Sequence, residues 1–217
     1  MQNDAISNLV PAHRDKCSLE RVLAASIGEV KSAECMERLL SRYGRLTTVF
    51  SAEAEEISRV GRVNMNAALL IKLVAYLNSR RVTEHFKFGV SHTEVELREY
   101  IAALFLGLSV ETVYALILDD KDRVIATELI SEGTVNASDV VPRKILECAR
   151  RKRSTSVILA HNHPKGSITA SKDDIMTTGR LFNLFATVGV RLRAHYIVAD
   201  GEIGRIDTDM LYSPNLV

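Results

Sequence analysis

The sequence has few of the features that mark secreted, membrane-spanning or strongly charged proteins. It contains only three cysteines, Cys17, Cys35 and Cys148, which lie far apart and form no Cys-x-x-Cys pair. Such scattered cysteines support neither a disulfide framework nor a thiolate zinc site, so we expect a reducing, cytoplasmic location. The sequence also has no run of about eighteen apolar residues, and we therefore expect no membrane span.

An excess of charge of one sign is missing as well. The 28 lysines and arginines are balanced by 27 acidic residues, which leaves a net charge of +1. A chain with so little net charge has no global field that would attract a nucleic-acid backbone. DNA therefore stays open as a partner, but the charge does not support it. The composition, 47% hydrophobic and 25% charged, is that of a globular chain that can bury a core.

The first half of the sequence has the apolar spacing of helices. Between about residues 18 and 81, apolar residues recur every three or four positions in short segments. These segments end at three glycines, Gly28, Gly44 and Gly61. The pattern predicts a compact all-α bundle. Because the period breaks over residues 82–93, we interpret this stretch as a connector and place one domain at residues 1–93 and a second at residues 94–217.

The second half alternates β-branched runs with amphipathic segments. After one further helix that begins near residue 94, it predicts a strand hairpin, a helix, a buried strand, a helix and a last strand, at residues 112–130, 142–153, 156–161, 171–189 and 191–199. Pro142 would lie in a first helical turn, where proline is tolerated. Strands that alternate with covering helices predict an α/β layered domain, so the whole chain is expected to be α+β.

Two histidines stand at the end of the predicted buried strand. His161 and His163 are two positions apart, and alternate side chains of a strand point to the same side, so both imidazoles can bind one ion. Asp174 follows in the first turn of the next helix, and on spacing alone the adjacent Asp173 is an equal candidate. Two imidazoles and one carboxylate suit zinc and leave a fourth position for water.

The same residues allow plainer interpretations. A His-x-His pair can occur by chance, and Ser171 with Asp174 could be only a helix-capping pair. His195, on an apolar strand, is more typical of a hydrogen-bonded core histidine than of a metal ligand. Lys165 would favour an acidic substrate if it faced the histidines, and is otherwise a solvated loop residue.

The segment HNHPKGSITASKDD has the spacing His-x-His, seven residues, Ser, two residues, Asp, which is the signature of the JAMM metalloenzymes. It resembles their RadC-like branch, and so does the preceding stretch ETVYALILDDKDRVIATELISEGTVNASDVVPRKILECA. The resemblance covers about residues 95–207 and extends to the helical half. It implies a helix-hairpin-helix-like N-terminal bundle followed by an α/β/α layered JAB/MPN domain, cytidine-deaminase-like, with a mixed β-sheet.

The resemblance also implies roles for individual residues. It selects Asp174 over Asp173 and implies one zinc per chain, bound by His161, His163 and Asp174. It implies that Glu111 accepts a proton from the zinc-bound water. It further implies that Ser171 helps to hold the developing oxyanion. Without the resemblance, three other glutamates compete for the role of the base: Glu128, Glu132 and Glu147.

We therefore expect a zinc metallopeptidase or isopeptidase that acts on a peptide or isopeptide substrate. The alternative is a DNA-associated accessory protein, whose helical half binds nucleic acid and whose zinc site is structural or vestigial. Val63 speaks against it, because it stands where a second glycine of a helix-hairpin-helix would let the turn approach a phosphate. A metal-dependent nuclease is a third option, disfavoured because such enzymes more often use carboxylate-rich sites with two metals.

Overall fold

The computed structural model describes residues 14–133, 137–164 and 166–206. Contacts divide the chain into two units, and each is described by itself. The first comprises Met1–Phe86, Val95–Ser109 and Asp200–Glu202, and the second comprises Lys87–Glu94, Val110–Ala199 and Ile203–Val217. The division into domains at residues 93 and 94 stays a prediction.

The first unit is helical, as its apolar spacing predicts. Its helices are α1 (Arg14–Ile27), α2 (Glu29–Tyr43), α3 (Leu46–Ser51), α4 (Ala54–Gly61), α5 (Met65–His85) and most of α6 (Glu94–Phe105). Buried apolar residues of α1 to α5 form one core, which includes Leu23, Met36, Val49, Ile57 and Ile71. One expectation is wrong in detail: the connector does not begin at residue 82, because α5 continues through His85.

The α4–α5 hairpin is closed by local hydrogen bonds. Gly61 is the last residue of α4, and Arg62 after it takes the left-handed conformation, with φ of 53°. The Ser58 hydroxyl donates to the Val63 carbonyl at 2.6 Å, and the Asn64 side chain caps α5. A Cβ atom at Gly61 would lie 2.7 Å from the Cys35 sulfur, so this glycine permits close packing against α2.

The second unit is built on a five-stranded mixed sheet with the order β2-β1-β3-β4-β5. Its elements are β1 (Thr112–Leu118), β2 (Val124–Glu132), α7 (Ala137–Arg151), β3 (Ser156–Asn162), α8 (Lys172–Thr187), β4 (Arg191–Ala199) and most of β5 (Glu202–Ile206). Strand β1 is antiparallel to both β2 and β3, whereas β3 and β4 are parallel. The long crossover between parallel strands is made by α8, as such connections require.

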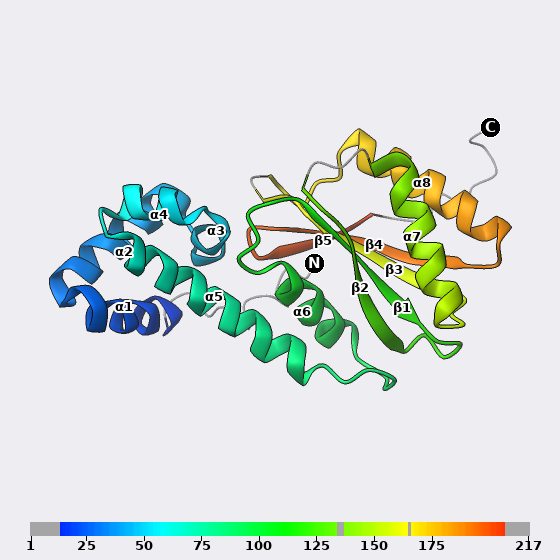
Figure 1. Cartoon of the computed structure of the whole chain (residues 1–217), viewed down its shortest axis with the longest axis horizontal. Helices are drawn as coiled ribbons and strands as arrows, with labels where there is room; N and C mark the ends of the chain where they lie inside the picture. The colour runs from blue at the N-terminus through cyan, green and yellow to red at the C-terminus, as the bar shows by residue number, and fades with distance from the viewer. Residues whose placement is uncertain (1–13, 134–136, 165, 207–217) are drawn as a thin grey trace. The chain divides into compact units, whose positions relative to one another are not determined.

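Helices α7 and α8 cover one face of this sheet, as Figure 1 shows. Their buried side chains, which include Ile145 and Phe185, pack against Ala115 and Ile117 of β1 and Leu159 of β3. The residues of β1 and β3 that take part are every second one, as expected for one face of a sheet. His161 follows Leu159 by two positions and therefore lies on the same face, toward α8.

The predicted order of elements is confirmed, with two corrections. Pro142 lies inside α7 and not in its first turn, because the helix begins five residues earlier, at Ala137. Its missing N–H leaves one backbone hydrogen bond of the helix unmade. Strand β5 was not expected, since it is short and follows directly on the turn at Asp200 and Gly201.

The α+β fold class predicted from the sequence is confirmed: a helical N-terminal part precedes a mixed sheet with helices, which is consistent with a JAB/MPN domain. Throughout the described ranges, each helix is too short or too polar to cross a bilayer.

Candidate metal centre

His161 and His163 occupy the end of the central strand β3. This strand is buried along its whole length between β1 and β4. His161 pairs with Val113 of β1 on one side and with Ile197 of β4 on the other. His163 follows the last strand residue, and its backbone N–H still bonds to the carbonyl of Val198. The backbone of both histidines is therefore held by the sheet.

Asp174 is presented by the first turn of α8. Ser171 is the N-cap of this helix and forms a capping box with Asp174, as the plainer interpretation of the pair predicts. The Ser171 hydroxyl accepts from the Asp174 N–H at 3.1 Å and donates to Asp174 Oδ2 at 2.7 Å. The Ser171 N–H also donates to Asp174 Oδ2, at 2.7 Å. These bonds hold the carboxylate in one orientation over the strand end.

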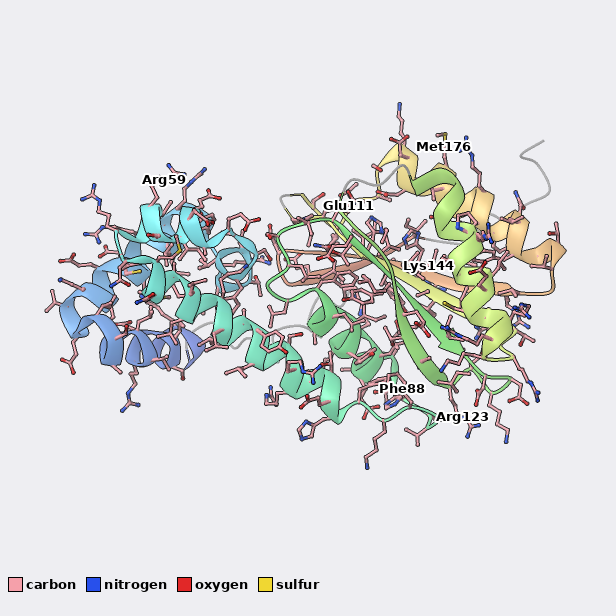
Figure 2. The ribbon with its side chains drawn as sticks, in the orientation of Figure 1. Arg59, Phe88, Glu111, Arg123, Lys144 and Met176 are labelled. Carbon is pink, nitrogen blue, oxygen red and sulfur yellow. The ribbon has the colours of Figure 1, made fainter. Side chains whose placement is uncertain are left out.

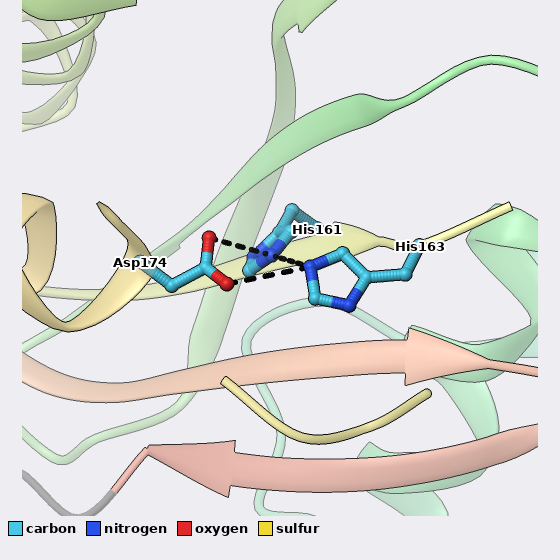
Figure 3. Close-up of side chains that lie close together, drawn as sticks. All are labelled: His161, His163 and Asp174. Atoms are coloured by element: carbon cyan, nitrogen blue, oxygen red, sulfur yellow. Dashed lines mark hydrogen bonds and ion pairs between the residues drawn. The ribbon is translucent and has the colours of Figure 1, made fainter. Parts of the chain in front are cut away.

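The three predicted ligands come together in the structure (Figure 3). His161 Nε2 lies 2.9 Å from His163 Nε2 and 3.2 Å from Asp174 Oδ1, and His163 Nε2 lies 3.4 Å from Asp174 Oδ2. Among the described residues, these three form a group whose ligand atoms lie within 4.8 Å of one another. Asp173 is exposed and outside this group.

A neutral imidazole carries a hydrogen on only one of its two nitrogens, so the partner of Nδ1 determines whether Nε2 has a free lone pair. His163 Nδ1 lies 2.7 Å from the carbonyl oxygen of Ser167, which can only accept, so Nδ1 carries the hydrogen. A neutral His163 therefore presents a lone pair at Nε2. His161 Nδ1 lies 2.9 Å from His195 Nε2, within the sheet. Both Nε2 atoms face the same small space beside the Asp174 carboxylate.

This donor set fits zinc. Zinc binds nitrogen and oxygen ligands at about 2.0–2.2 Å, which in a tetrahedral site places the ligand atoms about 3.4 Å apart. The distances of 2.9, 3.2 and 3.4 Å are near this value.

The protonation states of the residues at this site suit metal binding. Burial tends to raise the pKa of Asp174, but its contact with His161 and the hydrogen bonds from Ser171 outweigh this effect and hold the pKa well below its usual range. The carboxylate is thus ionised at neutral pH. Burial, aided by the neighbouring His161, lowers the pKa of His195 to about 3, so that His195 is neutral.

Glu111 lies just before β1, where Figure 2 labels it. Since Val113 pairs with His161 in antiparallel register, continuing the register by two residues sets Glu111 across from His163. The Glu111 side chain is exposed and lies outside the closely spaced group of ligands. Its backbone carbonyl accepts from the Gly133 N–H at 2.8 Å.

The side chain of Asn162 holds the backbone on both sides of Glu111. Asn162 Oδ1 accepts from the Thr112 N–H at 2.8 Å, and its amide donates to the Val110 carbonyl at 3.1 Å. Asn162 itself is buried. The residue between the two histidines therefore fixes the segment that carries the predicted base.

The competing glutamates occupy other positions. Glu128 pairs with Arg151 at 3.0 Å, and Glu147 pairs with Arg143 at 2.9 Å. Glu132 is exposed at the end of β2. Lys165 lies outside the described residues.

Two residues of the site, Asn162 and Thr178, were not predicted from the sequence. Thr178 is fully buried on α8, and its hydroxyl lies 2.7 Å from His195 Nδ1. The sequence spacing could have indicated Thr178, because this residue follows Asp174 by four positions and so lies on the same face of the helix. His195 is a hydrogen-bonded core histidine, as its apolar strand predicted, and its two partners are Thr178 and His161.

Comparison with known proteins agrees with this geometry. Residues 91–206 match the RadC-like JAB domain. A UPF0758 protein of Vibrio parahaemolyticus is 31% identical over 170 residues, which cover 78% of this chain and 76% of that protein. One of Photobacterium profundum is 31% identical over 182 residues (83% and 81%), and one of Vibrio atlanticus is 34% identical over 178 residues (78% and 76%). This chain belongs to the RadC-like JAB domain family.

Proposed function

We propose that this protein is a zinc-dependent hydrolase that cleaves a peptide or isopeptide bond. The observation that carries the proposal is the convergence of His161, His163 and Asp174 at distances of 2.9 to 3.4 Å. These residues would hold the zinc through His161 Nε2, His163 Nε2 and the carboxylate of Asp174. Bound zinc lowers the pKa of a water ligand toward about 7 and polarises a carbonyl group, which is the chemistry that amide hydrolysis needs.

The chain's own residues supply the proton transfers. Glu111 is the general base: it takes a proton from the attacking water and delivers it to the leaving amine. Its exposed position beside the end of β3 is accessible to a substrate, and Asn162 keeps its backbone in place. The Ser171 hydroxyl, which here donates to Asp174, turns to donate to the developing oxyanion of the substrate.

Metal content is the first test. The protein is purified without added zinc and analysed for elements, together with variants of single residues. We expect about one zinc per chain in the native protein, and its loss in His163→Ala and in Asp174→Asn. The neighbouring acid supplies a matched control, since Asp173→Asn should retain zinc because Asp173 lies outside the ligand group. A native chain that takes up no zinc, even after reconstitution, would contradict the proposal.

Hydrolysis is tested separately with the variant Glu111→Gln. This variant is expected to keep its zinc, because Glu111 is not a ligand, and to lose cleavage of peptide and isopeptide-linked substrates by about 100-fold or more. Cleavage is followed by mass spectrometry of a mixed peptide library. Equal cleavage by Glu111→Gln and the native protein would exclude Glu111 as the base.

A further inference from the structure

Behind the candidate metal centre, a chain of buried hydrogen bonds connects two of its ligands. The Thr178 hydroxyl donates to the backbone carbonyl of Asp174 at 2.5 Å. The same hydroxyl oxygen lies 2.7 Å from His195 Nδ1, and His195 Nε2 lies 2.9 Å from His161 Nδ1. Thr178, His195 and His161 are all buried, with at most 5% of their surface exposed. These hydrogen bonds run from α8 through β4 to β3.

The hydrogens in this chain can be assigned by counting. A threonine hydroxyl has one hydrogen, and here it is given to the Asp174 carbonyl, which can only accept. The hydroxyl oxygen must therefore accept from His195, so His195 Nδ1 carries a hydrogen. Thr178 thus determines which nitrogen of His195 is protonated.

The same logic continues to the metal ligand. A second hydrogen on His195 would make it a buried cation, which is costly unless it is paired. The neutral ring has a lone pair at Nε2, which accepts a hydrogen from His161 Nδ1. His161 then has no hydrogen at Nε2, the atom that faces His163 and Asp174. The chain of bonds leaves His161 in the one tautomer that can bind a metal through Nε2.

We propose that Thr178 and His195 are positioning residues that hold His161 in its Nδ1–H tautomer and so set the affinity of the site for zinc. The inference rests on the proposed function for its zinc part, whereas the tautomer belongs to the protein itself. Because Thr178 also bonds to the Asp174 carbonyl, the same two residues tie the ligand on β3 to the ligand on α8. Groups that orient metal-binding histidines commonly change metal affinity by about 10- to 100-fold when they are removed.

A substitution that removes the Thr178 hydroxyl but keeps the shape of the side chain separates the effect on the His161 tautomer from an effect on packing. Thr178→Val keeps the shape of the side chain but leaves His195 Nδ1 without an acceptor. His195 can then carry its hydrogen on Nε2, which forces His161 Nδ1 to accept and places a hydrogen on His161 Nε2, where the metal would bind. Thr178→Ser retains the hydroxyl and should restore the native tautomer. Thr187→Val, a threonine at the exposed end of the same helix, is the matched control.

Two measurements test the inference. Zinc affinity is measured by competition with a chromophoric chelator, and we expect Thr178→Val to bind about 10- to 100-fold more weakly, with Thr178→Ser and Thr187→Val within about threefold of the native protein. Imidazole tautomers are measured by nitrogen-15 NMR of the metal-free proteins at about pH 9, above the ordinary histidine range. We expect His161 to carry its hydrogen on Nδ1 in the native protein and in Thr178→Ser, and to lose this preference in Thr178→Val.

The outcomes are distinguishable. A native His161 with its hydrogen on Nε2 overturns the inference, and this measurement needs no variant, so that it decides even if Thr178→Val fails to fold. A folded Thr178→Val protein with native zinc affinity and native tautomers overturns it as well. Failure of the native protein to bind zinc contradicts the proposed function, while the tautomers of the metal-free protein still decide whether Thr178 and His195 position His161.

Discussion

Replacing Asn162 with alanine tests how the sheet holds the segment around the predicted base. The Asn162 side chain makes two hydrogen bonds, from the Thr112 N–H at 2.8 Å and to the Val110 carbonyl at 3.1 Å. The two bonds differ in what their loss costs. Thr112 is 1% exposed, so its N–H would lose its acceptor in a place that water does not reach, whereas Val110 is 38% exposed and its carbonyl can turn to solvent.

The expected loss of stability follows from this difference. An unsatisfied buried donor costs about 1–3 kcal/mol, and a replaceable hydrogen bond about 0.5–1 kcal/mol. We therefore expect Asn162→Ala to lower the free energy of unfolding by about 1.5–4 kcal/mol, the sum of the two contributions. Urea unfolding measures this loss as a lower midpoint with an unchanged slope. The amide of Thr112 should also exchange its hydrogen faster with solvent in the variant.

A matched control and a refuting result complete the test. Asn183→Ala changes an exposed asparagine of α8 and should shift the stability by no more than about 0.5 kcal/mol. If Asn162→Ala also stays within about 0.5 kcal/mol of the native protein, with Thr112 equally protected from exchange, Asn162 does not hold the start of β1 and the reasoning fails.

Three further predictions concern the rest of the fold. The Lys72 ammonium donates to three backbone carbonyls at 2.6, 2.8 and 3.0 Å, so Lys72→Met should destabilise the protein by about 2 kcal/mol in urea unfolding; an unchanged midpoint would refute this. Gly61→Ala should cost about 1–3 kcal/mol, because its Cβ would lie 2.7 Å from the Cys35 sulfur, and the same change in a Cys35→Ala background should cost much less. The hydrogen bond from Arg123 lowers the pKa of Asp119 in the folded protein, so this pair stabilises above the ordinary aspartate range and its contribution is lost as the pH falls through the folded pKa. On going from about pH 6 to about pH 3, the native protein should therefore lose more stability than Asp119→Asn, and equal losses would contradict the assignment.

Local pattern was sufficient to predict most of the elements. Helices with apolar residues at three- and four-residue spacing and strands rich in β-branched residues have periods that can be counted along the chain. The exceptions have local causes. Pro142 suggested a helix start at its own position, but the five residues before it are also helical, so the proline costs one hydrogen bond and does not end the helix. The helix α5 continues past residue 81 because residues 82–85 include neither glycine nor proline, which would stop a helix.

The candidate site was predictable in part. His161 and His163 could be placed on one side of a strand by the alternation of side chains, and Asp174 at a helix start by its capping position. The choice between Asp173 and Asp174 depended on resemblance, because the rotation of a helix about its axis is set by packing. In the structure Asp174 lies beside the histidines and Asp173 is exposed. The assignment of zinc and of the roles of Glu111 and Ser171 stays a prediction.

The sequence by itself determined the type and order of most of the elements, the spacing of the two histidines and the acid at the start of the following helix. Only the tertiary structure decided which side chains form hydrogen bonds with the predicted ligands from the interior of the protein. His195 on β4 and Thr178 on α8 lie 34 and 17 positions from His161 in the sequence. His195 bonds to His161, and Thr178 bonds to His195, across elements that become neighbours only in the folded protein. Such partners cannot be derived from a local period, because the parallel pairing of β3 and β4 and the packing of α8 bring them together.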